Sequence, residues 1–523
     1  MTIPGLALLA ALTLAGPASG QEPFDLLIRG ARVLDGTGNP WFFADLGVTG
    51  DRIAAVGDLS DRTAATVVEA EGLYLAPGFI DAHSHAGPAL ATPELSAAVP
   101  LLQQGLTTVL VNPDGGGPTD LVAQRRALTE AGIGVNVAQL VPHGSVREAV
   151  LGHEDRAPTS SELDRMRALV RAGMEAGAFG LSSGPFYAPG NFSDTDELVA
   201  LARVAAEHGG AYTSHIRDES DYSIGLIAAV DEVITVAREA GLPGVVTHVK
   251  ALGPRVWGFG AAIVQRIDRA RAQGIEVYAD QYPYDASSTG LDAALVPRWA
   301  QVGGQDSLDA RLADPDTRAR IRGDMVENLD RRGGADRIMF RRYVDDPSIE
   351  GRTLADLARE QGRDPLDAAL DLVEGGGPGI ISFNMHEDDI RVLMAQPWTM
   401  TASDGSLVPI GEGVPHPRSY GTFPRKLRRY ALDERVVDLA AAVRSMTSLP
   451  ANVFGLHDRG IVREGAVADL TLFDPERIVD RAEFADPHQL SEGVVHVLIG
   501  GRFAVQDGRV LPERHGRVLE RRP

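Results

Sequence analysis

Cysteine is absent from the 523-residue chain, and lysine occurs only twice, as Lys250 and Lys426. The first absence excludes disulfide bonds, thiolate metal sites and cysteine nucleophiles. The second restricts any functional lysine to two positions. The chain instead contains 44% hydrophobic residues, 23% charged residues and 58 glycines. This composition is typical of a glycine-rich globular enzyme and unlike that of a disordered or fibrous protein.

Positive charge is also scarce, because 50 Lys and Arg residues stand against 72 Asp and Glu residues, for a formal net charge of -22. A chain this acidic is not expected to bind nucleic acid or an anionic membrane surface, since neither supplies compensating positive charge. The net charge does not exclude an anionic substrate, which responds to the local field of a pocket.

The N-terminus carries a short apolar run, residues 6 to 15, followed by the small residues Ala18, Ser19 and Gly20. This pattern predicts a signal peptide over residues 1–20, although no Lys or Arg precedes the apolar run. The run is too short for a stable membrane span. We therefore expect an exported protein, periplasmic or secreted. The alternatives are an uncleaved anchor and a misassigned start codon.

Two separated parts of the chain have the pattern of short strands. Residues 21–76 alternate apolar and polar positions between turn signals, as in "FDLLIRGARVLDGTGNP", and the pattern returns in "GAVADLTLFDP" and "VVHVLIGGRFAVQDGRVL". Such alternation is typical of antiparallel strands. We expect residues 21–76 and the end of segment 431–523, after the last helices, to form one small β domain.

The chain between these parts alternates short buried strands with helical segments. Examples are "TTVLVNP", "GVVTHVKALG" and "IEVYADQYPY" for strands, and "SELDRMRALVRAGMEAG" for a helix. About eight such βα units predict an α/β fold, a (β/α)8 TIM-type barrel over residues 77–430. A doubly wound open sheet is the alternative. The charged, loop-rich residues 285–348 interrupt the alternation and indicate an insertion near the barrel mouth.

Polar side chains follow the predicted strands where each one ends. His83 and His85 in "FIDAHSHAGP" are two residues apart, so both imidazoles point to one side of an extended strand. The carboxyl ends of barrel strands meet at one face. Singly, each residue could be a core histidine or a turn aspartate, but together they predict a site for one or two metal ions, with Zn²⁺ as the default. The further ligand candidates are Asp114, His215, His248 and Asp404.

Several longer stretches resemble the N-acyl-D-amino-acid deacylase (D-aminoacylase) family of the amidohydrolase superfamily. They include "PGFIDAHSH", "GLSSGPFYAPGNFSDTDELVAL", "YTSHIRDE", "DQYPYDASST", "ASDGS" and "PHPRSYGTFPRKL". The resemblance extends from about residue 24 to 511. It implies a (β/α)8 barrel flanked by a small β-sandwich domain built from both chain ends.

The resemblance also implies roles for the strand-end residues. His83, His85, His215, His248 and Asp404 would be metal ligands. The family usually has a cysteine where this chain has Asp114, so the ligand there would be a carboxylate, or none. A carboxylated lysine bridging two metals is disfavoured, since "FGLSSG" contains no lysine, and this argues against a hydantoinase or dihydroorotase.

The expected chemistry is amide hydrolysis by metal-activated water, with Asp404 taking a proton and returning it to the departing amine. The family resemblance implies that the substrate carries an amide and a free carboxylate, and the residues implied to bind it are Lys250, Arg418, Tyr187, Tyr282 and Ser288. His143 and Asp218 are expected to have supporting or structural roles.

The leading hypothesis is an N-acyl-D-amino-acid deacylase. A D-specific dipeptidase or another amidase or lactonase on the same scaffold is the alternative within the class. Outside it, the alternative is a non-catalytic periplasmic metal- or ligand-binding protein, which would have no need of a proton acceptor such as Asp404. The oligomeric state is not predicted by the sequence.

Overall fold

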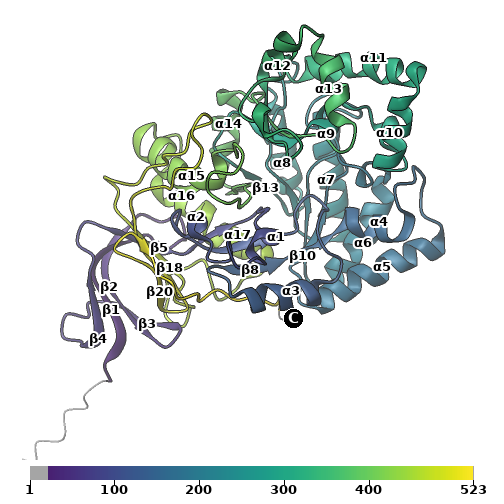
Figure 1. Cartoon of the computed structure of the whole chain (residues 1–523). Coiled ribbons are helices and arrows are strands. Elements are labelled where there is room, and N and C mark those ends of the chain that lie inside the picture. The colour runs from purple at the N-terminus through teal and green to yellow at the C-terminus, as the bar shows by residue number, and fades with distance from the viewer. Residues whose placement is uncertain (1–21, 522–523) are drawn as a thin grey trace, which may run out of the picture.

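A computed structural model describes residues 22–521 (Figure 1). The predicted signal peptide lies outside these residues. Within residues 22–521, no helix has both the length and the apolar character needed to cross a bilayer. The described chain forms a β domain, a barrel and an inserted subdomain, and the α/β fold predicted from the sequence is confirmed.

The β domain contains strands from both ends of the chain, joined in one nine-stranded sheet. In Figure 1 the purple N-terminal strands lie beside the yellow C-terminal ones. An isolated bridge from Arg52 to Val467 brings the β3 edge back toward β18, so the sheet encloses its own apolar core. The strands are β1 (Phe24–Val33), β2 (Phe42–Thr49), β3 (Arg52–Gly57), β4 (Ala64–Glu69), β5 (Tyr74–Pro77), β18 (Leu470–Phe473), β19 (Val494–Ile499), β20 (Arg502–Gln506) and β21 (Arg509–Val510).

The barrel has eight parallel strand positions. Two sheets supply them, one with the order β6-β7-β8 and one with the order β17-β13-β12-β11-β10-β9. The strands are β6 (Phe79–Asp81), β7 (Leu106–Val111), β8 (Asn136–Gln139) continued by β9 (Val141–Pro142), β10 (Gly180–Ser183), β11 (Ala211–Ser214), β12 (Gly244–Val246), β13 (Val277–Gln281) and β17 (Thr399–Thr401).

Hydrogen bonds between the first and last strand positions close the barrel. Ser84 and Gly405 form a parallel bridge. The Asp404 amide donates to the His83 carbonyl at 2.9 Å, and the His85 amide donates to the Gly405 carbonyl at 2.9 Å. This ladder joins the segment carrying His83 and His85 directly to the segment carrying Asp404, which excludes the open doubly wound sheet.

Helices surround the barrel because their apolar faces pack on its strands. The ends of several helices follow local rules: Thr159 and Glu162 form a capping box at the start of α5, and Gly241 ends α7 in the left-handed conformation. The helices are α1 (Gly87–Leu90), α2 (Val99–Leu102), α3 (Leu121–Ala131), α4 (His143–Leu151), α5 (Ser160–Glu175), α6 (Thr195–Glu207), α7 (Leu226–Ala240), α8 (Gly260–Ala272), α14 (Glu387–Met394), α15 (Arg418–Arg425), the π-helical η5 (Lys426–Asp433), α16 (Leu439–Met446) and α17 (Ser448–Phe454).

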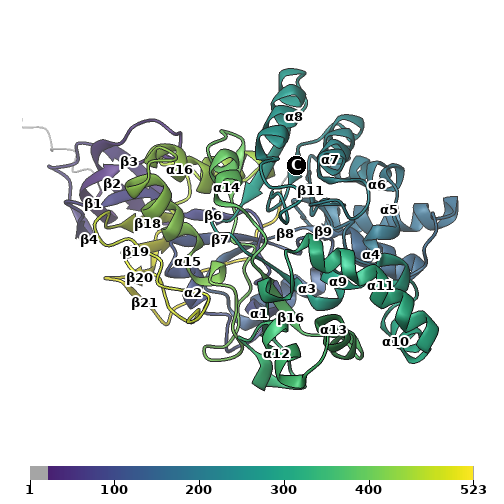
Figure 2. The same ribbon diagram turned by 90° about the horizontal axis from the view of Figure 1, so that it is seen from above.

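The insertion between β13 and β17 extends further than residues 285–348. It continues to Ser382 and forms an antiparallel sheet of order β14-β16-β15 with its own apolar core. Its last helices have the same amphipathic pattern as barrel helices, so the sequence alone did not separate them. The elements are β14 (Ser287–Gly290), α9 (Leu291–Leu295), α10 (Gln305–Ala313), α11 (Pro315–Arg331), β15 (Ile338–Arg342), α12 (Leu354–Gln361), α13 (Pro365–Val373) and β16 (Gly379–Ser382). Figure 2 shows its helices away from β1–β4.

Candidate active site

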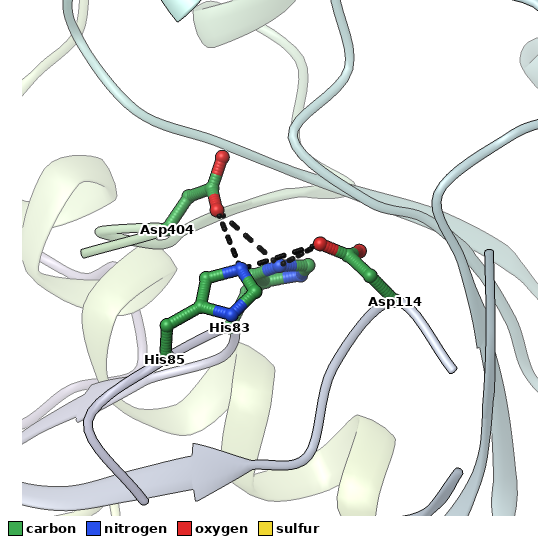
Figure 3. Close-up of side chains that lie close together, drawn as sticks. All are labelled: His83, His85, Asp114 and Asp404. Carbon is green, nitrogen blue, oxygen red and sulfur yellow. Dashed lines mark ion pairs between the residues drawn. The ribbon is translucent and has the colours of Figure 1, made fainter. Parts of the chain in front are cut away.

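The structure brings all six predicted metal ligands together at the carboxyl end of the barrel. They follow β6, β7, β11, β12 and β17. Their nitrogen and oxygen atoms form two groups, and Asp114 belongs to both. The first group is His83, His85, Asp114 and Asp404, and the second is Asp114, His215 and His248. Figure 3 shows the first group, with both imidazoles between the two carboxylates.

Asp114 connects the two groups through different oxygen atoms. Its Oδ2 lies 3.4 Å from His83 Nε2 and 3.3 Å from His85 Nε2. Its Oδ1 lies 3.4 Å from His248 Nε2 and 3.9 Å from His215 Nδ1. A carboxylate can donate one oxygen to each of two neighbouring metals, so the residue in the place of the family's cysteine has the geometry of a bridging ligand.

The backbone is turned at three of these positions. Asp114, His248 and Asp404 have φ values of 56°, 35° and 49°, in the left-handed region that non-glycine residues rarely adopt. Such conformations concentrate at functional sites, where the surrounding structure holds them. Here they turn each side chain inward just after its strand ends. Gly184, which follows β10, packs against this turn, and a Cβ there would lie 2.2 Å from the Asp114 carbonyl oxygen.

The donor atoms suit a metal ion because several of them lack a hydrogen-bond partner among the described residues. His83 Nε2, His215 Nδ1 and Asp114 Oδ1 are buried and have no hydrogen-bond partner among the described residues. Buried polar atoms normally have partners, and leaving several unpaired in one place is costly. Imidazole and carboxylate donors in this number suit one or two zinc ions.

The electrostatics of the site hold Asp404 in its ionised form. Burial by itself would raise the pKa of Asp404, but the positive charges of Arg418 and His248 outweigh burial and hold the pKa well below its usual value. Arg418 Nη1 lies 2.8 Å from Asp404 Oδ2. The other oxygen, Oδ1, lies 3.1 Å from His85 Nε2. One oxygen is thus fixed by an arginine while the other faces the ligands.

Three buried carboxylates behind the ligands were not predicted from the sequence. Asp81 Oδ1 accepts hydrogen bonds from the amides of His83, at 3.2 Å, and Ser403, at 2.8 Å. Asp280 Oδ1 accepts from the His248 amide at 2.6 Å. These bonds fix the backbone beside His83, His248 and Asp404. The signal was present, because Asp81 and Asp280 each stand at the end of an apolar strand segment.

Glu219 is the third of these carboxylates, and it lies beside two ligand histidines. Its Oε1 lies 3.2 Å from His248 Nδ1, and its Oε2 lies 3.7 Å from His215 Nε2. It also forms a buried ion pair with Lys250. A carboxylate on the outer nitrogen of a ligating histidine orients the ring and selects its tautomer. Its position four residues after His215 was the available sequence signal.

Known proteins resemble this chain over nearly its whole length. The Amidohydrolase family profile matches residues 66–505. N-acyl-D-glutamate deacylase of Alcaligenes xylosoxydans xylosoxydans is 37% identical over 96% of this chain and 97% of its own. D-aminoacylase of the same organism is 35% identical over 96% and 99%. The chain belongs to the amidohydrolase family.

A solved structure supports the same assignment for this amidohydrolase. N-acyl-D-glutamate deacylase of Bordetella bronchiseptica, crystallised with zinc and a phosphonate inhibitor, is 36% identical, with a TM-score of 0.82 over 95% of this chain and 100% of its own. The resemblance to N-acyl-D-amino-acid deacylases, the barrel with a β domain and the hydrolase class are therefore confirmed.

The five residues implied to bind substrate all line one cavity of about 530 Å³, which most of the candidate ligands also line. Two of them form ion pairs: Lys250 with Glu219, and Arg418 with Asp404. The Tyr282 ring lies 4.6 Å from the Arg418 guanidinium. Burial raises the pKa of the Tyr282 hydroxyl well above the usual value. The Thr289 hydroxyl donates to the Tyr187 hydroxyl oxygen at 3.3 Å, and the Ser288 hydroxyl donates to the Ile380 carbonyl at 2.9 Å.

His143 and Asp218 lie outside this cavity lining and have structural contacts. His143 Nε2 lies 2.8 Å from Glu197 Oε1 in a buried pair. Asp218 accepts hydrogen bonds from the amides of Ser220, at 2.9 Å, and Gly225, at 3.0 Å. Asp218 thus organises the loop that leads into α7.

Proposed function

We propose that this amidohydrolase removes the acyl group from N-acyl-D-amino acids with the help of one or two zinc ions. The observation that carries the proposal is the position of Asp404: an ionised carboxylate beside His83 and His85, in the lining of a cavity that also holds Lys250 and Arg418. A protein that only binds a metal or ligand does not need such a proton acceptor.

The residues that would hold zinc are the six strand-end ligands, with Asp114 shared between two positions. When bound, zinc polarises the amide carbonyl and makes water a stronger acid. Asp404 supplies the proton transfer: its Oδ1 faces the site and accepts a proton, then delivers it to the departing amine nitrogen. Arg418 keeps Oδ2 in place, so the same oxygen is available for both transfers.

Other residues that line the cavity would orient the substrate. The guanidinium of Arg418 and the ammonium of Lys250 suit the α-carboxylate, while Tyr187 and Tyr282 remain protonated because burial raises the pKa of both well above the usual value. Protonated hydroxyls can donate to carboxylate or carbonyl oxygens. Holding the carboxylate and the scissile carbonyl at two separate places fixes the stereocentre between them, which is how a D-isomer would be selected.

The test is the steady-state kinetics of protein with a measured zinc content on N-acetyl-D-methionine and its L-isomer. We expect turnover of the D-isomer, loss of activity after chelation and recovery with added zinc. Turnover of a D,D-dipeptide or a lactone in preference to both substrates would favour the dipeptidase or lactonase alternative. Zinc binding without any turnover would contradict an enzymatic function.

We also propose that the protein is exported, because residues 1–20 have the apolar run and small-residue cleavage pattern of a signal peptide. Expression of the full chain in a Gram-negative host followed by fractionation tests this. We expect the mature protein in the periplasm with its N-terminus near Gln21. An uncleaved chain in the cytoplasmic fraction would contradict export.

A further inference from the structure

Two arginines that line the active-site cavity have no acidic partner in the part of the chain that the structure describes. Within residues 22–521, neither Arg332 nor Arg341 has a carboxylate oxygen within 4.0 Å. The carboxylates of the cavity are engaged elsewhere: Asp404 with Arg418, Glu219 with Lys250, Glu148 with His153, and Asp114 with the histidines. The cavity therefore carries positive charge that the described residues do not neutralise.

The fold directs Arg341 into the cavity. It lies on β15, where the pairing with β16 is regular up to Phe340 and resumes at Arg342, so Arg341 is the extra residue of a β-bulge. A bulge turns one side chain out of the alternation of its strand. The Arg341 guanidinium lies over Gly379 of β16, where a Cβ would come within 2.9 Å of Nη2.

The Arg341 side chain is poorly satisfied in this position. Its Nε is buried without a hydrogen-bond partner among the described residues. Burial lowers the pKa of Arg341, and the positive charge of Arg418 lowers it further. Arginine nevertheless stays charged. A largely buried guanidinium without a counter-ion is costly, and an anion entering the cavity would remove that cost.

Arg332 adds to the same excess of positive charge. It is 1% exposed, its Nη1 donates to Ser382 Oγ at 3.1 Å, and its Nε has no partner among the described residues. Arg332, at the end of α11, and Arg341, on β15, both belong to the insertion. The insertion therefore contributes the unpaired cations, while the barrel contributes the ligands and their paired cations. A substrate with two negative groups matches this distribution.

We propose that Arg341 binds a second anionic group of the substrate, the side-chain carboxylate of an acidic D-amino acid. The preferred substrates are then N-acyl derivatives of D-glutamate or D-aspartate rather than of neutral D-amino acids. This inference rests on the proposed deacylase function. It assigns side-chain selection to a residue of the insertion that was not among the residues expected to bind substrate.

The experiment compares N-acetyl-D-glutamate with N-acetyl-D-glutamine, which share the acetyl group, the α-carboxylate and the side-chain length and differ in side-chain charge. We expect wild type to prefer the glutamate substrate. Arg341→Gln should lose about 10- to 100-fold in kcat/KM on it, as expected for a lost charge-assisted hydrogen bond, and less than about 3-fold on the glutamine substrate. Arg341→Lys keeps the charge without the paired donors, so its kcat/KM on the glutamate substrate should lie between the values for wild type and Arg341→Gln.

The control is Arg342→Gln, which removes the neighbouring arginine, part of a surface pair with Glu412 at 3.0 Å. We expect no change on either substrate. Zinc content and melting temperature establish that each variant is folded. Equal losses on both substrates in Arg341→Gln, or no wild-type preference for glutamate, would overturn the inference and leave the deacylase function intact. Failure of wild type on these substrates and on N-acetyl-D-methionine would overturn the function itself.

Discussion

Arg418 and Asp404 form a buried ion pair in which Nη1 lies 2.8 Å from Oδ2. The pair places the predicted carboxylate-binding residue next to the predicted proton acceptor. Asp404 therefore has one oxygen held by an arginine and one oxygen, Oδ1, directed toward His83 and His85. The residue proposed to bind substrate is thus in contact with the residue proposed to transfer the proton, and Asp404→Asn and Arg418→Lys test the two roles separately.

Asp404→Asn should lower kcat by at least about 10²-fold, because it removes the proton acceptor and preserves the shape of the side chain. Asparagine also tolerates the positive φ of 49° at this position. Metal analysis should show that most of the zinc is retained. Near-normal turnover in the zinc-loaded variant would contradict the assigned role.

Arg418→Lys should reduce kcat/KM on an N-acyl-D-amino acid by about 10- to 150-fold, since lysine offers a point charge where arginine offers two parallel donors. The control substrate has the α-carboxylate replaced by an amide, and the variant should lose little further activity on it. Equal losses on both substrates would show that Arg418 acts through Asp404 and not through the substrate carboxylate.

Asp114→Ala should reduce the number of zinc ions per chain, because Asp114 contributes an oxygen to each ligand group. Asp114→Cys should keep metal and shift the preference toward softer ions such as Cd²⁺. Asp120→Ala, which alters only the exposed start of α3, is the matched control and should keep the wild-type content. Unchanged stoichiometry in Asp114→Ala would mean that Asp114 is a turn residue only.

Glu219→Gln should weaken zinc binding by about 10- to 100-fold, the usual effect of losing a carboxylate behind a ligating histidine. The variant leaves the Lys250 ammonium, 2.7 Å from His248 Nδ1, without its counter-charge. Adding Lys250→Met should recover part of the loss. Competition with a chelator gives the zinc affinity of each variant, and an unchanged affinity in Glu219→Gln would contradict a positioning role.

Lys426 provides a pH prediction away from the ligands. Burial lowers its pKa to about 7, and its Nζ donates to Thr401 Oγ1 at 2.9 Å and to Ser445 Oγ at 2.8 Å. The unfolded chain keeps that proton up to about pH 10. Between pH 7 and 10 the unfolded state binds more protons, so the free energy of unfolding rises with pH, by at most about 1.4 kcal/mol per pH unit.

The comparison is with Lys426→Met, which removes the titrating group. The melting temperature of wild type relative to Lys426→Met should therefore increase between pH 7 and pH 9. A difference that stays constant or decreases over this range would show that Lys426 is already charged in the folded protein.

The sequence by itself determined the candidate metal ligands and the architecture, because both depend on local patterns. A histidine or aspartate that directly follows an apolar strand segment must lie at the strand's carboxyl end, and in a parallel barrel all such ends meet at one face. His83, His85, His215, His248 and Asp404 were found in this way. Family motifs supplied the cavity residues Tyr187, Tyr282 and Ser288, which the structure places along the same cavity.

Only the tertiary structure decided which residues support the ligands and which charges remain free. Glu219 and Asp280 contact His248 across strand boundaries, and sequence spacing does not predict a contact between residues 29 or 32 positions apart. The end of the insertion could not be predicted from the sequence, because an amphipathic helix has the same pattern whether it packs on a barrel or on a separate core. Arg341 is the clearest case: its direction is set by a one-residue bulge, which shifts strand pairing without leaving a hydrophobic signature.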